Sequence, residues 1–167
     1  DGGVTIGLII LVTHAHGADN NQRIRALFSS AFAITAVIGV CGLLPLAGLV
    51  TFVDWGALLK LTDPALQSEA ASVAAIIILS MAVGYPACVV RQGRLGLQQG
   101  AEANTWDLAA TLITFAGQLA VVYSGLGLVA LATVTAATPV LLNTISSALF
   151  LLTNGREFRP QLSLASW

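Results

Sequence analysis

The sequence is poor in charged residues. Only seven of its 167 residues are Lys or Arg and only eight are Asp or Glu, whereas 56% are hydrophobic. A soluble domain carries more charge at its surface than this, so the composition excludes that class and indicates a membrane protein. The net charge of -1 points to no acidic or basic partner, and we expect no nucleic acid to bind.

Cysteine and histidine are also scarce. Cys41 and Cys88 lie in apolar stretches with neither metal-ligand spacing nor a disulfide-rich context, and we interpret them as small hydrophobic residues. His14 and His16, with Asp19 nearby, are too few to predict a metal site. Two histidines and scattered acids also form no catalytic arrangement. We therefore expect no enzyme, no catalytic residues, no metal and no cofactor.

Long apolar runs, by contrast, are plentiful. Four of them match the roughly 17 to 25 residues that a helix needs to cross a hydrocarbon core of about 30 Å. They cover about 29–53, 68–90, 105–123 and 127–152. Because a backbone inside a bilayer must satisfy its own hydrogen bonds, these spans are predicted to be helices. The sequence therefore predicts an all-α, polytopic membrane helix bundle that forms a single domain over residues 1–167.

A shorter apolar run occupies residues 3–13. As a helix it would extend about 16 Å, which is about half the thickness of the hydrocarbon core. We interpret it as the end of a partial helix, and the chain as a fragment that begins within that helix.

Small residues and turn signals indicate how the spans are connected and packed. Asp63-Pro64 predicts the N-terminus of a helix, and the run YSGLG at 123–127 predicts a tight turn that makes the last two spans an antiparallel hairpin. Thr35, Gly39 and Gly42 form a small face on the first full span, which predicts a close helix contact.

The basic residues are distributed asymmetrically. Three arginine pairs precede the first full span, separate the second from the third, and follow the fourth, which places all of them on one side of an antiparallel bundle. They are Arg23 and Arg25, Arg91 and Arg94, and Arg156 and Arg159. The other side receives only Lys60. Since Lys and Arg are enriched in cytoplasmic loops, we assign 14–28, 91–104 and 154–167 to the cytoplasm.

Polar side chains recur inside the last two spans. In the third span, polar residues follow spacings of four, three and four, which place them on one face of a helix. The fourth span repeats the pattern with smaller residues. Together the two stripes supply six candidates for the lining of a substrate cavity: Asp107, Thr111, Thr114, Gln118, Asn143 and Ser147.

These stripes have two interpretations. Polar groups inside a membrane can line a water-filled cavity, but small and hydroxylated residues also let helices pack closely. Packing is the ordinary role for Thr111, Thr114 and Ser147, whereas both roles stay open for Gln118 and Asn143. Asp107 lies next to Trp106, so it is either a charge at a helix N-terminus or a functional group.

The arginines between and before the spans also have two interpretations. Guanidinium groups bind phosphate through paired hydrogen bonds, so Arg23, Arg25, Arg91 and Arg94 are candidates for contact with lipid headgroups or a pyrophosphate. Their ordinary role is to orient the chain in the membrane. The glycines at 93, 96 and 100 do not follow a phosphate-loop pattern and predict no nucleotide site.

Several loop segments resemble those of a known family. The runs LQQG at 97–100 and NTW at 104–106 are similar to the loop between the fourth and fifth helices of bacterial polysaccharide transporters. These are the flippases of lipid-linked O-antigen within the multidrug/oligosaccharidyl-lipid/polysaccharide exporter superfamily. NQRIRALFSS at 21–30 resembles the stretch after their second helix, and VDWG at 53–56 the external end of their third. Aligned this way, the chain covers the end of helix two through helix six.

The resemblance implies one lobe of a two-lobe transporter in the bacterial inner (plasma) membrane. Such a transporter flips undecaprenyl-pyrophosphate-linked oligosaccharide for O-antigen, lipopolysaccharide or exopolysaccharide biosynthesis, by alternating access. Its partners would be the lipid-linked oligosaccharide, membrane lipids and the second lobe of its own chain. Apart from Asp107, no charged residue lies deep in a predicted span, so cations for a pyrophosphate are expected elsewhere.

Two alternatives remain. One is another exporter of the same superfamily, for drugs or peptidoglycan precursors, which would show acidic residues in its membrane helices. The other is a helical membrane scaffold that transports nothing, in which the polar stripes are helix contacts.

Overall fold

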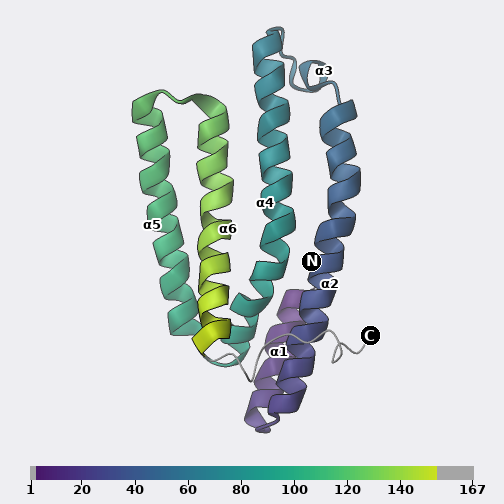
Figure 1. The fold of residues 1–167 in the computed structure, drawn as a ribbon, viewed down its shortest axis with the longest axis vertical. Helices are drawn as coiled ribbons and strands as arrows, with labels where there is room; N and C mark the ends of the chain where they lie inside the picture. The colour runs from purple at the N-terminus through teal and green to yellow at the C-terminus, as the bar shows by residue number, and fades with distance from the viewer. Residues whose placement is uncertain (1–2, 154–167) are drawn as a thin grey trace.

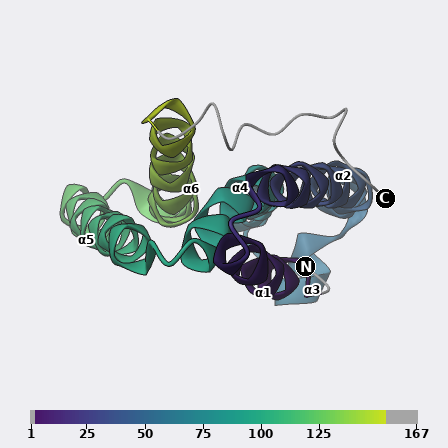
Figure 2. The ribbon, with the colours of Figure 1, turned by 90° about the horizontal axis from the view of Figure 1, so that it is seen from below.

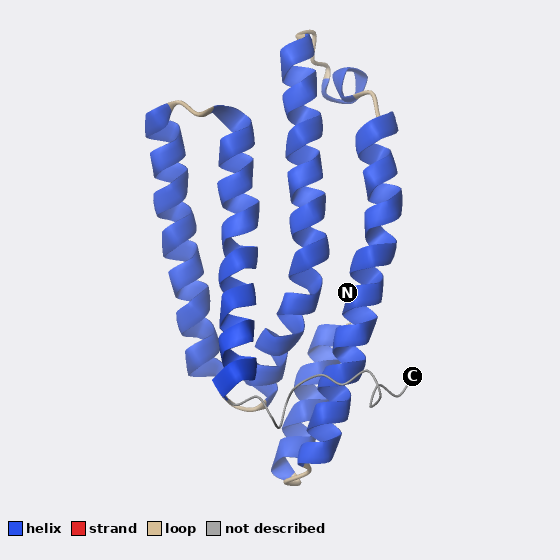
Figure 3. Ribbon diagram, in the orientation of Figure 1, coloured by secondary structure: helices blue, strands red, loops and turns tan. Residues whose placement is uncertain are grey.

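A computed structural model of the chain describes residues 3–153, and every regular element in this range is a helix (Figures 1 and 3). The helices are α1 (Val4–Gly17), α2 (Asn21–Phe52), α3 (Trp55–Leu59), α4 (Pro64–Gly96), α5 (Gly100–Ser124) and α6 (Gly127–Thr153). α2, α4, α5 and α6 are long and apolar enough to cross a membrane. The predicted all-α membrane helix bundle is therefore confirmed.

The helices extend beyond most of the predicted spans. α2 begins at Asn21 rather than at 29, α4 covers 64–96 rather than 68–90, and α5 begins at Gly100 rather than at 105. Apolar run length measures only the part of a helix that suits the hydrocarbon core, whereas backbone hydrogen bonding continues into the polar flanks. α6 matches its predicted span closely, because a glycine turn precedes it directly.

The prediction that 91–104 is a loop is wrong. α4 continues through Gly96, α5 begins at Gly100, and only three residues connect them. Gln98 adopts the left-handed conformation, with φ 62, and the Gln99 amide donates to the Arg94 carbonyl at 2.9 Å. Polar composition suggested a loop, but Arg91 and Arg94 remain helical because their side chains have partners on neighbouring helices.

The ends of the bundle alternate as an antiparallel chain requires. The α1–α2 and α4–α5 turns lie at one end, and the α2–α4 connection and the α5–α6 turn lie at the other (Figure 1). We call the first end the basic end, because the described arginines lie toward it: Arg23, Arg25, Arg91 and Arg94. Arg156 and Arg159, in the predicted loop 154–167, lie outside the described residues.

The two predicted turn signals are confirmed at the opposite end. Asp63 caps α4 by accepting a hydrogen bond from the Ala65 amide at 2.9 Å, and Pro64 is the first residue of the helix. Gly125, in the left-handed conformation with φ 65, ends α5. α5 and α6 therefore form an antiparallel hairpin.

α4 is the central helix of the bundle. It contacts α1, α2 and α3 on one side and α5 and α6 on the other, whereas α1 and α2 make no contact with α5 or α6 (Figure 2). Within the described residues, the hairpin is therefore joined to the remaining helices through α4 alone.

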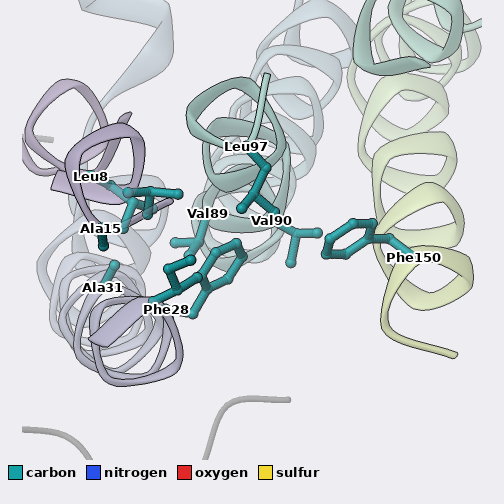
Figure 4. Packing of buried hydrophobic residues seen from close by; sticks show 10 residues of the cluster. Leu8, Ala15, Phe28, Ala31, Val89, Val90, Leu97 and Phe150 are labelled. Carbon is teal, nitrogen blue, oxygen red and sulfur yellow. The ribbon is translucent and has the colours of Figure 1, made fainter. Parts of the chain in front are cut away.

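The core of the protein is an apolar cluster near the basic end, formed by residues of α1, α2 and α4 together with Phe150 of α6 (Figure 4). Phe28, Ile24 and Val12 are fully buried. Two glycines of α4 make this packing possible: a Cβ atom on Gly93 would lie 2.0 Å from Phe28 Cζ, and one on Gly96 would lie 2.8 Å from Val12 Cβ. These glycines therefore allow close helix packing, as is common between membrane helices.

The predicted small face of the first span is confirmed in part. Thr35 and Gly39 are buried, and a Cβ atom on Gly39 would lie 2.8 Å from the Ala82 carbonyl oxygen of α4. Gly42 has no atom within 4 Å of such a Cβ position, so it takes no part in this contact.

Candidate functional site

Arg94 of α4 forms side-chain contacts with both α5 and α6. It lies in the last turns of α4 with only 5% of its side chain exposed. Its Nη1 donates to Ser146 Oγ of α6 at 2.9 Å, and its Nη2 donates to Glu102 Oε2 of α5 at 2.6 Å. The guanidinium carbon also lies 5.3 Å from the centre of the Phe150 ring, within the range of a cation–π contact.

This burial corrects the interpretation of Arg94 as a headgroup ligand. Its guanidinium faces protein groups from α5 and α6, so a phosphate at the surface cannot reach it without rearrangement of those helices. A buried cation requires charge and hydrogen-bond partners, and Glu102, Ser146 and Phe150 provide them.

Arg91 forms a second ion pair three residues earlier on the same face of α4. Its Nε donates to Asp107 Oδ2 at 2.8 Å, and its Nη2 also bonds to that oxygen. About a third of each side chain is exposed. Asp107 lies in the third turn of α5, so it does not act as a helix N-terminal charge and instead neutralises Arg91.

Most of the predicted polar stripe meets in one groove on the outer side of the α5–α6 hairpin. This polar groove has a volume of about 450 Å³. Its lining consists of Asp107, Ala110, Thr111, Thr114, Phe115 and Gln118 from α5, with Pro139 and Asn143 from α6. Five of the six cavity candidates thus lie together.

Hydrogen bonds show how these groups are held. The Thr111 hydroxyl donates to the Asp107 carbonyl at 2.8 Å, and the Gln118 amide donates to Thr135 Oγ1 of α6 at 2.9 Å. Thr114 Oγ1 is buried and has no hydrogen-bond partner among the described residues. The Gln118–Thr135 bond is a contact between α5 and α6, yet Gln118 also lines the groove. One residue of this stripe therefore has both roles, helix packing and cavity lining.

Ser147 does not join the polar groove. Its hydroxyl donates to the Ala87 carbonyl of α4 at 3.3 Å. With Asn143, Ser146 and both arginines it lines a small chamber of about 10 Å³ between α4, α5 and α6. The stripe predicted on the fourth span is therefore divided, because α6 packs against α5 on one side and α4 on the other.

Arg23 and Arg25 lie apart from the other two arginines. Both belong to the first turns of α2, a helix that has no contact with α5 or α6. Arg23 is exposed, and its backbone amide donates a hydrogen bond to Asn20 Oδ1 at 3.0 Å. The four headgroup candidates therefore do not form a single cluster.

Four residues of this region escaped prediction. Glu102, Ser146 and Phe150 contact Arg94, and Thr135 contacts Gln118. Glu102 carried a usable signal, since an acid eight residues from an arginine in an apolar chain has few other partners. Ser146 carried none, because it lies 52 positions from Arg94. Thr135 lies 17 positions from Gln118 on the next helix, so local spacing gave no signal there either.

A separate apolar groove lies between α4 and α6, away from the arginines. Its volume is about 390 Å³, and its lining includes Ile77, Met81, Tyr85 and Val140. Such a surface suits contact with lipid hydrocarbon.

Among the described residues, no group of three or more His, Cys, Asp and Glu side chains is placed to hold a metal ion. No protein-family model, curated protein or solved structure matches this chain.

Proposed function

We propose that this chain is part of a membrane transporter that moves lipid-linked oligosaccharide across the bilayer, without catalysing a covalent reaction. The observation that carries the proposal is the polar groove on α5 and α6. Its volume of about 450 Å³ is lined by hydroxyl, amide and carboxylate groups beside the apolar Ala110, Phe115 and Pro139, and polar groups at such a position are costly to expose to lipid.

The charge balance of the groove favours an uncharged, polyhydroxylated substrate portion. Asp107 is its acidic group, and Arg91 neutralises that carboxylate. The remaining accessible polar lining, from Thr111, Gln118 and Asn143, can exchange hydrogen bonds with sugar hydroxyls. Together with the family resemblance of the loops, this supports undecaprenyl-pyrophosphate-linked oligosaccharide as the substrate and the bacterial inner membrane as the location.

Genetic complementation tests the proposal. The full-length protein would be expressed in a bacterium that lacks its own O-antigen flippase, together with the matched glycan pathway, and surface glycan would be measured. We expect surface glycan to be restored. Failure under every matched pathway would exclude this substrate class, and restored drug resistance or peptidoglycan synthesis in its place would identify another exporter.

Matched variants test whether the groove is the path. Thr111→Val and Gln118→Leu remove hydrogen-bonding groups, whereas the control Ile113→Val changes an exposed apolar residue of the same helix. Loss of a hydrogen bond worth about 1.4 kcal/mol would lower glycan export about tenfold, with the control unchanged. Equal export in all three variants would contradict the groove as a path and favour the scaffold alternative.

A further inference from the structure

One of the three guanidinium nitrogens of Arg94 makes no hydrogen bond among the described residues. Nη1 and Nη2 are engaged by Ser146 and Glu102, which together with the Phe150 ring hold the group in place. Arg94 Nε is buried and has no hydrogen-bond partner among the described residues. A buried donor on a charged group destabilises the fold when it lacks an acceptor, so an acceptor is expected beside it.

The small chamber next to Arg94 has the size of one water molecule. Its volume is about 10 Å³, and a cavity of roughly 10–15 Å³ is the smallest that holds a water. A phosphate, a carboxylate or a sugar hydroxymethyl group is too large for this space.

The walls of the chamber offer the hydrogen bonds that a buried water needs. Such a water typically makes about three of them. Besides Arg94, the chamber is lined by the Asn143 amide, which donates and accepts, and by the Ser147 hydroxyl, which keeps acceptor capacity while it donates to Ala87.

The charge balance of the region argues against an anion in the chamber. Arg91 and Arg94 supply two positive charges, and Asp107 and Glu102, paired with them, supply two negative charges. A small neutral ligand that accepts a hydrogen bond from Arg94 Nε and bonds to Asn143 fits both the volume of the chamber and the balanced charge around it.

We propose that the chamber binds one structural water that links Arg94 on α4 to Asn143 on α6. This water gives Arg94 Nε an acceptor and adds to the attachment of the hairpin to α4. The inference does not depend on the proposed transport function, because it rests on the orphaned donor and the chamber around it.

Radiolytic labelling of the full-length protein in ¹⁸O-labelled water tests this proposal. Trp106 lines the chamber, whereas Trp55 lies at the opposite end of the bundle. Both tryptophans are half-buried. An X-ray pulse converts a bound water to a hydroxyl radical that oxidises its neighbours. We expect label at Trp106 to accumulate several times faster than at Trp55. Equal rates at the two residues would overturn the proposal.

Two further measurements sharpen the test. Ala103→Val fills the chamber, so it should bring Trp106 labelling down to the Trp55 rate, and unchanged fast labelling would contradict the proposal. Replacement of chloride by gluconate should leave the melting temperature unchanged, because the ligand is water. A chloride-dependent melting temperature that Ala103→Val abolishes would identify an anion there and overturn the assignment.

Discussion

α4 packs on its two sides by different means. Toward α1 and α2 it presents Gly93 and Gly96, and the contact is apolar and so close that a single Cβ atom would not fit. Toward α5 and α6 it presents Arg91 and Arg94, whose ion pairs and hydroxyl bond add polar contacts to the apolar packing of Val90 against Phe150. Both surfaces come from the same two turns of α4, because each of these glycines lies two residues after one of the arginines.

The difference shows two ways to join helices where lipid is the solvent. Between apolar helices in lipid there is little hydrophobic gain, so close van der Waals contact through glycine holds α1 and α2 to α4. On the hairpin side, directional polar contacts near the basic end supplement the apolar packing of α6 on α4.

The largest expected effect comes from truncating the same aromatic residue on each side. Phe28 is 0% exposed in the apolar cluster, and Phe115 is 56% exposed beside the polar groove. Phe28→Ala should lower the free energy of unfolding by about 3–5 kcal/mol, because it opens a cavity. Phe115→Ala should change it far less. Thermal unfolding of the purified protein in detergent measures both, and similar losses would refute the division into two kinds of packing.

Removal of the Arg94 guanidinium should have the next largest effect. Arg94→Met keeps much of the apolar stem but loses the bonds to Ser146 and Glu102. We expect a loss of about 1.5–3 kcal/mol, the range for hydrogen bonds to charged groups, because Glu102 stays solvated at 66% exposure. Arg23→Met, at an exposed position, is the control and should be nearly neutral. A neutral Arg94→Met would show that the network does not stabilise the fold.

A smaller effect is expected from glycine substitutions on the apolar side. Gly93→Ala should cost about 1–3 kcal/mol through the clash with Phe28, partly offset by about 1 kcal/mol of better helix propensity. Gly42→Ala, with no neighbour near its Cβ position, should retain the propensity gain. If both variants gained stability, the close contact at Gly93 would be contradicted.

The smallest effect on stability should come from Asp107. Its ion pair with Arg91 is about one third exposed, so Asp107→Asn should cost at most about 1 kcal/mol. The charge-swapped double variant, Arg91→Asp with Asp107→Arg, should recover most of that loss. A double-mutant cycle that shows no coupling would mean that the pair does not contribute to holding the hairpin.

Sequence patterns predicted much of this molecule. The spacing of Asp107, Thr111, Thr114 and Gln118 placed them correctly on one face, since helical periodicity is a local property. Asp63-Pro64 and the glycine turn at 123–127 were equally local, and both were confirmed.

The errors share one physical cause. The polar run at 91–96 suggested a loop, but it remains helical because Glu102, Ser146 and Asp107 satisfy its arginines across helix boundaries. Partners from other helices leave no trace in a local window. For Ser147 the two interpretations could not be separated from the sequence, since its contact with Ala87 depends on how α6 is rotated against α4.

Composition and hydropathy alone specified a helical membrane bundle, because few charges and long apolar runs permit no other way to satisfy the backbone in lipid. Only the packed structure showed that Arg94 lies inside the bundle, whereas its neighbour Arg91 stays about one third exposed. A guanidinium can be buried only where partners from other helices converge on it, and that convergence is a property of the tertiary fold.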